Sequence, residues 1–215
     1  MKPVLLIGAG KFALEIAHYL EDCVRASAFK LELAGYVPLA GDAIAAPQAS
    51  IREGPWESLW NGEAALVLAS SDPDQRAGFF DDLDPIQRDR FITFVHPSAT
   101  GDGIPQHARG TIIGPHCHVG VNTRIGDFCV LNYLLSIGHH SEIGEGNFFS
   151  PGFHCGNSVS IGRRNFFGLG CVVGPGVQVG HANRIQAGSL ILETIGNAMV
   201  CVPTQRTKFI PSEGA

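Results

Sequence analysis

One apolar residue recurs at every sixth position through the second half of the chain. The fourteen positions of this register, all apolar, are Ile113, Val119, Ile125, Leu131, Ile137, Ile143, Phe149, Cys155, Ile161, Phe167, Val173, Val179, Ile185 and Ile191. A six-residue period excludes the 3.6-residue period of an α-helix and is typical of a parallel β-helix. If three hexads form one triangular coil, residues 18 apart stack at about 4.8 Å, and the register predicts about five coils.

Glycine follows the repeated apolar residue in ten of the fourteen hexads. We interpret these glycines as corners where the backbone adopts a φ that other residues avoid. Asn132 takes the place of glycine at one corner, and asparagine also tolerates that region. Two places before the apolar residue the side chain is often small, at Thr111, Cys117, Thr123, Cys129, Ser141, Cys171 and Ser189. The six cysteines contain no C-x-x-C pair, so we expect buried free thiols, with no zinc site or disulfide.

The first part of the chain alternates strand and helix patterns. A buried strand at residues 4–7 leads through a glycine turn at residues 8–13 into a helix at residues 14–22. Further strands are expected at residues 33–37, 64–69 and 91–95, and a second helix at residues 73–83. The sequence therefore predicts an α/β, half-Rossmann-like domain over residues 1–92, followed by the β-helix over residues 93–215.

The glycine turn has the form G-x-G-x-x-A, which fits many α/β turns. A dinucleotide site also needs an acidic residue about 20 positions later, and residues 35–38 supply none. NAD is therefore not expected. A tight strand-to-helix turn without a ligand remains an alternative.

Composition narrows the choice of partners. The chain is 45% hydrophobic and 16% charged, as in a folded globular protein, and its net charge of −5 gives no basic footprint for nucleic acid. The apolar run at the N-terminus is too short for a signal peptide or a membrane span. We expect a cytoplasmic protein with neither a nucleic-acid nor a membrane partner.

Three segments together resemble one family. GAGKFALEIA at residues 8–17, FVHPSA at residues 94–99 and SIGHHSEIG at residues 136–144 are similar to the PglD/NeuD-type sugar acetyltransferases, which are hexapeptide-repeat, left-handed β-helix enzymes. The resemblance implies acetyl-CoA-dependent transfer to an amino or hydroxyl group of a sugar, often nucleotide-linked. It also implies left-handed winding and a homotrimer with intersubunit active sites.

The resemblance also assigns roles to residues of the β-helix. It makes His139 the general base that takes a proton from the attacking group, a role that suits imidazole near neutral pH. It places Asn157, one coil away in the same column, against the acetyl-CoA carbonyl, where a backbone N–H would stabilise the oxyanion. Leu169 and Ala187 match other cofactor-lining positions. Asn132 matches a substrate-contacting position, although its reading as a glycine substitute is equally good.

The N-terminal domain is expected to bind the acceptor. We predict that it uses the backbone of Gly10, Lys11 and Phe12 together with the strand end at Ala69, Ser70 and Ser71.

The chain departs from the family pattern at three places. His140 stands where relatives have an acid that orients the catalytic imidazole, so Glu142 or a group from another subunit is left to take that role, or the base is weaker. His140 itself is a second candidate for the catalytic residue. Phe148 replaces a second histidine of some relatives. Val37 and Pro38 replace an acidic pair that contacts the nucleotide, so the acceptor could be a different molecule. The sequence does not separate N-acetylation from O-acetylation.

Two other functions compete with the acetyltransferase. A γ-class carbonic anhydrase holds zinc with three histidines on the same fold, and His118 and His154 share a column. No third histidine lies near His154 at a suitable spacing, so no metal is expected. The second alternative is a non-catalytic β-helix scaffold, which the absence of an acid after His139 favours. A scaffold would not bind acetyl-CoA.

Overall fold

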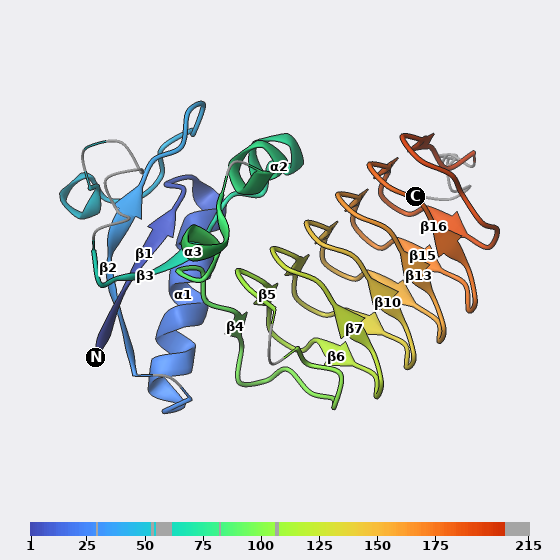
Figure 1. The fold of residues 1–215 in the computed structure, drawn as a ribbon, viewed down its shortest axis with the longest axis horizontal. Helices are drawn as coiled ribbons and strands as arrows, with labels where there is room; N and C mark the ends of the chain where they lie inside the picture. The colour runs from blue at the N-terminus through green and yellow to red at the C-terminus, as the bar shows by residue number, and fades with distance from the viewer. Residues whose placement is uncertain (29, 53, 55–61, 82, 106–107, 205–215) are drawn as a thin grey trace, which may run out of the picture.

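The computed structural model describes residues 1–28, 30–52, 54, 62–81, 83–105 and 108–204. A small N-terminal α/β part leads into a parallel β-solenoid of about six turns (Figure 1). The fold class predicted from the sequence, a half-Rossmann-like part followed by a left-handed parallel β-helix, is confirmed. The expected number of about five coils was too low, because the stacking begins before Ile113 with Phe94 paired to Ile112 and continues after Ile191 with Cys201 paired to Ile185.

The N-terminal part contains one small parallel sheet, in the order β2-β1-β3. Its elements are β1 (Lys2–Ile7), α1 (Lys11–Arg25), β2 (Leu31–Val37), a 3₁₀ turn η1 (Gln48–Ser50), β3 (Ala65–Leu68), α2 (Pro73–Asp81) and α3 (Pro85–Arg88). The strand expected at residues 91–95 does not join this sheet as a unit. Phe91 forms an isolated bridge with Leu66, whereas Phe94 and Val95 form β4 of the solenoid, because the segment lies 18 residues before the first hexad strand.

The solenoid has three sheets, and each of the central coils contributes one short strand to each of them. The seven-stranded sheet contains β4 (Phe94–Val95), β5 (Ile112–Ile113), β8 (Val130–Leu131), β11 (Phe148–Phe149), β14 (Phe166–Phe167), β17 (Arg184–Ile185) and β19 (Val200–Cys201). The five-stranded sheet contains β6 (His118–Val119), β9 (Ser136–Ile137), β12 (His154–Cys155), β15 (Val172–Val173) and β18 (Leu190–Ile191). The four-stranded sheet contains β7 (Arg124–Ile125), β10 (Glu142–Ile143), β13 (Ser160–Ile161) and β16 (Gln178–Val179).

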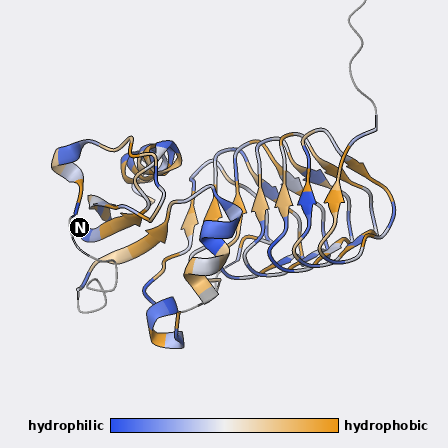
Figure 2. Ribbon diagram, turned by 90° about the horizontal axis from the view of Figure 1, so that it is seen from above, coloured by the Kyte–Doolittle hydropathy of each residue, from blue (hydrophilic) through white to orange (hydrophobic). Residues whose placement is uncertain are grey.

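The repeated apolar residue is the second residue of each two-residue strand, and it points into the prism. All fourteen of these side chains are at most 8% exposed, and the strands form a hydrophobic row along the axis (Figure 2). Phe149 and Phe167 stack with ring centroids 5.0 Å apart, one coil above the other. The hexad register therefore builds one continuous apolar core, as the sequence predicts.

Polar ladders run through the prism at the small positions. Thr111 and Thr123 donate their hydroxyls to backbone carbonyls, and Cys117, Cys129 and Cys171 occupy equivalent sites. Asn147, Asn165 and Asn183 form a ladder that the sequence analysis missed: the side-chain oxygen of each of the first two accepts both the backbone and the amide N–H of the next. Every buried corner amide in this column is thereby satisfied.

The glycines after the apolar positions serve a purpose other than the one expected. None of these ten has a positive φ; the left-handed residues lie two places further on, as at His140 (φ 57°) and Gly170 (φ 64°). A Cβ at Gly138 would lie 2.3 Å from the backbone of Gly156, and one at Gly168 would lie 2.5 Å from the Ala187 nitrogen. Glycine is required because adjacent coils approach too closely for a side chain, so the expectation of an unusual φ was wrong.

The N-terminal part covers the first strands of the seven-stranded sheet. The outward residues Phe94, Ile112, Val130 and Phe148 share one hydrophobic cluster with the buried face of α1. Phe12 of α1 meets Phe148 with ring centroids 5.9 Å apart. Part of one face of the prism is therefore buried within the chain, and its last strand, β19, is exposed at Val200.

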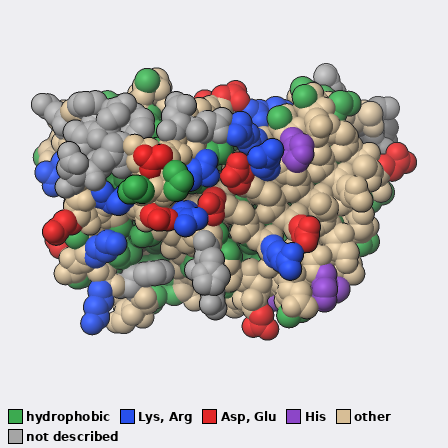
Figure 3. Space-filling model, in the orientation of Figure 1, with side chains coloured by type: hydrophobic (Ala, Val, Ile, Leu, Met, Phe, Trp, Pro, Cys, Tyr) green, Lys and Arg blue, Asp and Glu red, His purple; other side chains and the backbone are tan. Residues whose placement is uncertain are grey.

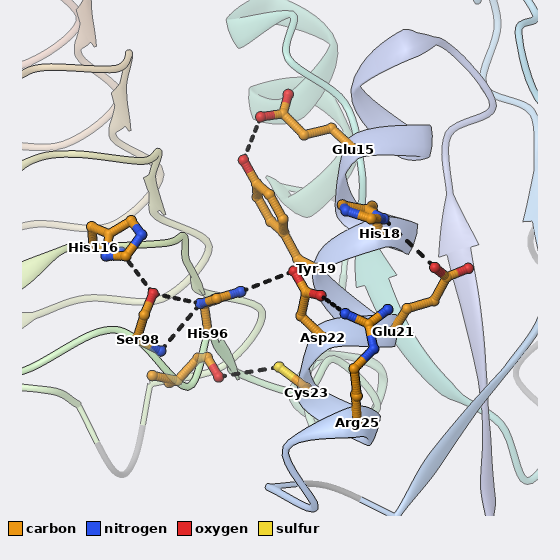
Figure 4. A network of polar contacts seen from close by, with 11 residues as sticks. Glu15, His18, Tyr19, Glu21, Asp22, Cys23, Arg25, His96, Ser98 and His116 are labelled. Carbon is orange, nitrogen blue, oxygen red and sulfur yellow. Dashed lines mark hydrogen bonds and ion pairs between the residues drawn. The ribbon is translucent and has the colours of Figure 1, made fainter.

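A polar network joins α1 to the first coil (Figure 4). His96 Nε2 lies 3.4 Å from an Asp22 carboxylate oxygen, and His96 Nδ1 lies 2.7 Å from the Ser98 hydroxyl. Ser98 in turn accepts a hydrogen bond from the backbone N–H of His116, one coil away. The hydrogen bond with His96 holds the pKa of Asp22 below its usual range. The HPSA segment thus fastens the α/β part to the prism.

The coil contact predicts a large difference between two glycines. Replacing Gly168 by Ala pushes a methyl group against backbone and is expected to lower the free energy of unfolding by about 2–3 kcal/mol. Gly174→Ala is the control, because its nearest neighbour is the flexible Leu192 side chain at 3.1 Å, and we expect a loss below about 1 kcal/mol. Chemical denaturation measures both values. Equal losses would contradict the coil-contact explanation.

The junction predicts a pH-dependent contribution from Asp22. Because its folded pKa is lowered, its stabilisation is present above the unfolded pKa of about 4 and is lost as the pH falls through the folded value. Asp22→Asn is therefore expected to lower the melting temperature at pH 7, and its difference from the wild type should narrow below about pH 4. The exposed Glu21→Gln serves as the control. A difference that stays constant between these pH values would refute this account.

Candidate functional site

A cleft in the α/β part gathers the predicted acceptor residues. Its volume is about 360 Å³. It is lined by all six of the predicted residues, namely Gly10, Lys11, Phe12, Ala69, Ser70 and Ser71. The structure therefore brings together two segments that lie about sixty positions apart in the sequence.

The strand ends explain why these segments meet. β1 and β3 are parallel neighbours, so their carboxyl ends lie at the same edge of the sheet, where α/β folds bind ligands. The Ala69 N–H donates to the Ile7 carbonyl at 2.8 Å. Gly8 has φ 126°, and a Cβ there would lie 2.6 Å from the Ala69 carbonyl oxygen. Gly8 is thus needed for the close approach that shapes the cleft.

The start of α1 gives the cleft a positive end. Gly10 is the N-cap, no side chain caps the helix, and no acidic residue lies in its first turn. The first N–H groups of a helix have no partner within it, and the helix dipole adds partial positive charge there. The start of α2 differs, because the Asp72 carboxylate accepts from the N–H groups of Asp74 and Gln75. Of these two helix starts in the described part of the chain, that of α1 is the one left to receive an anion from outside.

Asp42 forms a cleft wall that the sequence analysis missed. One carboxylate oxygen accepts from the Ala9 N–H at 2.8 Å and from the Leu39 N–H at 2.9 Å. Gln75 reaches the same loop, donating to the Ala40 carbonyl at 3.0 Å. The segment around Asp42 has no periodic pattern, so the sequence carried no signal that would place it beside the glycine turn.

Arg76 supports the strand end from behind. It is 1% exposed, and its guanidinium donates to the carbonyls of Leu68, Ser70 and Phe128. Burial lowers the pKa of Arg76 to about 10. Its Nε has no hydrogen-bond partner among the described residues. This buried cation joins the cleft to the prism without a carboxylate to offset its charge.

His139 lies at a different place, on the corner between β9 and β10. The ring is exposed, and the backbone carbonyl of His139 accepts from the Ser158 N–H of the next coil at 2.9 Å. Its Nδ1 lies 2.9 Å from the Nδ1 of His140. Glu142, a possible orienting acid, lies on the four-stranded sheet and forms an ion pair with Arg124 at 3.4 Å. The side chain beside the imidazole is thus His140, and the prediction that Glu142 orients it finds no support.

The three predicted cofactor positions share one backbone property. Among the described residues, the N–H groups of Asn157, Leu169 and Ala187 donate to no carbonyl or side chain. These residues are exposed corner positions, so their N–H groups are free to bind a ligand oxygen. Asn157 stacks below His139 at the corner between the five- and four-stranded sheets, whereas Leu169 and Ala187 lie at the corner before the five-stranded sheet. The predicted positions therefore border both edges of the five-stranded sheet.

Two predicted or noted positions have structural contacts. Asn132 is 7% exposed, and its side-chain oxygen accepts from the Tyr133 N–H at 2.9 Å, which favours its reading as a corner residue. Phe148 stacks on Phe166 with ring centroids 5.6 Å apart and packs against Phe12. The histidine of some relatives is thus replaced by a packing residue.

His118, His154 and the buried cysteines of the prism have local contacts. His118 is hydrogen-bonded to the Thr100 hydroxyl at 3.1 Å, and His154 to the Ser136 hydroxyl at 2.9 Å. The described residues contain no group of three or more metal-ligating side chains. Burial raises the pKa of the Cys117 and Cys129 thiols to about 12, so they remain protonated, as small buried side chains.

Charged side chains are mixed on the face seen in Figure 3, where basic groups lie beside acidic ones. Glu145, for example, contacts Arg88 at 3.5 Å and Arg163 at 3.8 Å. None of the helices in the described part of the chain is long and apolar enough to span a bilayer.

The fold defines the class of protein. An α/β part is joined to a parallel β-helix, as in β-helix acetyltransferases. No protein-family model matches the sequence, and no curated protein sequence matches it. Among solved structures, PerB from Caulobacter crescentus with bound CoA and GDP-perosamine is 22% identical, with a TM-score of 0.77 over 93% of each chain. A variant of that protein is described as a perosamine N-acetyltransferase.

Two further structures have the same architecture. The acetyltransferase domain of PglB from Neisseria gonorrhoeae with acetyl coenzyme A is 17% identical, with a TM-score of 0.77 over 93% of this chain and 95% of that one. WeeI from Acinetobacter baumannii is 15% identical, with a TM-score of 0.71 over 93% and 96%. These likenesses show that the chain shares both parts of the fold, in the same order, with known acetyltransferases.

Proposed function

We propose that this chain is an acetyl-CoA-dependent acetyltransferase that modifies the amino group of a nucleotide-linked amino sugar. The observation that carries the proposal is the acceptor cleft. All six predicted residues line one cavity at an uncapped helix start, in a chain whose whole fold matches acetyltransferases solved with CoA, acetyl coenzyme A or GDP-perosamine.

His139 is the general base of this proposal. A neutral imidazole accepts the proton of the acceptor amine as its nitrogen attacks the thioester carbonyl, which typically contributes ~100- to 10,000-fold to the rate. The free N–H of Asn157, one coil away, is available to the carbonyl oxygen as negative charge develops there. The thiolate of CoA leaves when the carbon–sulfur bond breaks, and the acetyl group remains on the acceptor.

The acceptor cleft favours an anionic ligand. The α1 N-terminus and the Lys11 ammonium group supply positive charge at its mouth, as in other phosphate-binding helix starts. A nucleotide diphosphate would bind there, and the sugar would extend from the cleft. Val37, the last residue of β2 and 2% exposed, and Pro38 stand in place of the acidic pair of relatives, so we expect recognition of the nucleotide base to differ from theirs.

The two halves of the site lie on different sides of one chain. The cleft belongs to the part that covers the seven-stranded sheet, whereas His139 lies at the one corner of the prism that this sheet does not adjoin. In this proposal a cleft meets the His139 of another copy. A homotrimer with three intersubunit sites satisfies this geometry, because three copies related by a threefold axis bring corner and cleft together at each interface.

We place the reaction in the cytoplasm. Each of the six cysteines is a free thiol, and most are buried, as is usual where the redox environment is reducing.

The base assignment predicts the behaviour of His139→Ala. We expect kcat to fall by roughly 100-fold or more while acetyl-CoA affinity stays nearly unchanged, since the lost interaction is made in the transition state. The exposed His18→Ala is the control. A thiol-release assay with acetyl-CoA and nucleotide-linked amino sugars, free amino sugars and sialic acids measures turnover, and product analysis separates N- from O-acetylation. Wild-type protein that neither binds acetyl-CoA nor acetylates any of these acceptors would instead favour a non-catalytic scaffold.

Shared sites predict complementation between two inactive variants. Gly10→Trp fills the cleft, because a Cβ at Gly10 is free of close contact and lies 3.6 Å from the Ala43 carbonyl oxygen. Co-expressed with His139→Ala, it should form mixed trimers in which about a quarter of the sites keep both an open cleft and a base. Each variant alone should be inactive. Failure of purified mixed oligomers to recover activity would place both groups in one chain.

A further inference from the structure

Three side chains, linked by hydrogen bonds, form a series that ends at the proposed base, His139. Asn122 Nδ2 lies 3.0 Å from His140 Nε2, and His140 Nδ1 lies 2.9 Å from His139 Nδ1. The two rings are nearly perpendicular, with an interplanar angle of 86°. In the described part of the chain, no carboxylate pairs with either histidine. The position held by an acid in relatives is therefore occupied by a contact between two imidazoles.

The β-helix backbone places the three side chains of this hydrogen-bonded series. Asn122 and His140 are 18 residues apart and occupy the same left-handed corner position in successive coils, with φ 59° and 57°. The His140 N–H donates to the Val121 carbonyl at 2.9 Å, which fixes one corner above the other. Asparagine tolerates this conformation, and a stacked pair of corners places its amide beside the imidazole of the next coil.

The contact between the two Nδ1 atoms requires particular tautomers of His139 and His140. Two Nδ1 atoms 2.9 Å apart share one hydrogen, so one ring donates and the other accepts. If His139 donates, its Nε2 carries the free lone pair that a base needs. His140 then accepts at Nδ1 and must carry its own proton on Nε2, where the Asn122 amide accepts it through its oxygen. If the amide presents its NH₂ group, as Nδ2 is placed here, the order reverses and the His139 proton moves to Nε2. A half-turn of the amide exchanges oxygen and nitrogen and gives the first arrangement.

We propose that Asn122 and His140 are positioning residues that set the tautomer of His139. The inference rests on the proposed function of His139 as a base. His140 takes the place of the acid of relatives as a neutral acceptor, and the Asn122 amide, which is exposed and free to rotate, decides which nitrogen of His140 is protonated. In the competent arrangement the chain runs from His139 Nδ1–H to His140 Nδ1 and from His140 Nε2–H to the Asn122 oxygen. When His139 takes the acceptor proton, the same contact stabilises its imidazolium.

Replacing Asn122 separates a tautomer effect from a packing effect. A carboxylate can only accept, so Asn122→Asp holds His140 in the Nε2–H form and favours the competent His139 tautomer. Asn122→Ala leaves the tautomer of His140 unset. We expect kcat of Asn122→Asp to exceed that of Asn122→Ala by about tenfold, with similar KM values for both substrates. Equal kcat values for the two variants would overturn the proposal.

His140 is tested at its own corner. His140→Gly removes the ring and suits the left-handed backbone, so a fall in kcat of about tenfold would reflect the lost contact and not strain. Ala182→Gly, at an exposed left-handed corner on another coil with φ 57°, is the matched control and should leave kcat unchanged. Wild-type kcat in His140→Gly would overturn the role of His140.

Imidazole ¹⁵N NMR tests the tautomer without any turnover. We expect His139 to be protonated on Nδ1 in the wild type and in Asn122→Asp, and to shift toward Nε2–H in Asn122→Ala; His139→Gln assigns the signals. A His139 protonated on Nε2 in all three proteins would overturn the relay. If the tautomers follow the prediction while His139→Ala keeps full turnover, the role of Asn122 and His140 in setting the tautomer is supported and the role of His139 as base is refuted. The two hypotheses can therefore be refuted separately.

Discussion

The close contact between successive coils is the constraint on which the solenoid depends. A Cβ at Gly120, Gly138 or Gly156 would lie 2.3–2.7 Å from atoms of the next coil, so these positions leave no room for a side chain. That contact fixes the 18-residue stacking, and the stacking places Asn122 over His140 and His139 over Asn157. The chemistry of the corner therefore follows from the backbone repeat, and a one-residue slip would remove every one of these pairs.

The hexad period predicts most of the prism and little of its ends. It identifies the fourteen inward residues and the columns, because both depend only on sequence spacing. It does not reveal the turn formed by β4, where the apolar register had not begun, or the Asn147 ladder, where a polar residue replaces a small one. The roles of the glycines were misjudged because sequence alone does not separate a close approach from a positive φ; both favour glycine.

The candidate site was predicted as two unconnected sets of residues. The glycine turn and the end of β3 were recognisable because strand ends of parallel sheets converge. Asp42 and Arg76 were not, since one lies in an aperiodic loop and the other in an ordinary helix, and tertiary structure alone brings them to the cleft. Likewise, the contact between His139 and His140 depends on side-chain orientation at a corner, which spacing does not determine.

The charges around the cleft decide what it can hold. The carboxylate of Asp42 is already satisfied by two backbone N–H groups, and that of Asp72 caps α2, so both are engaged with positive backbone dipoles. The α1 N-terminus has no capping side chain, whereas the buried guanidinium of Arg76 donates to three backbone carbonyls and does not line the cleft. A ligand with negative charge would therefore gain from the start of α1, and a neutral sugar would not. The charge at this end of the cleft supports the anionic acceptor of the proposed function.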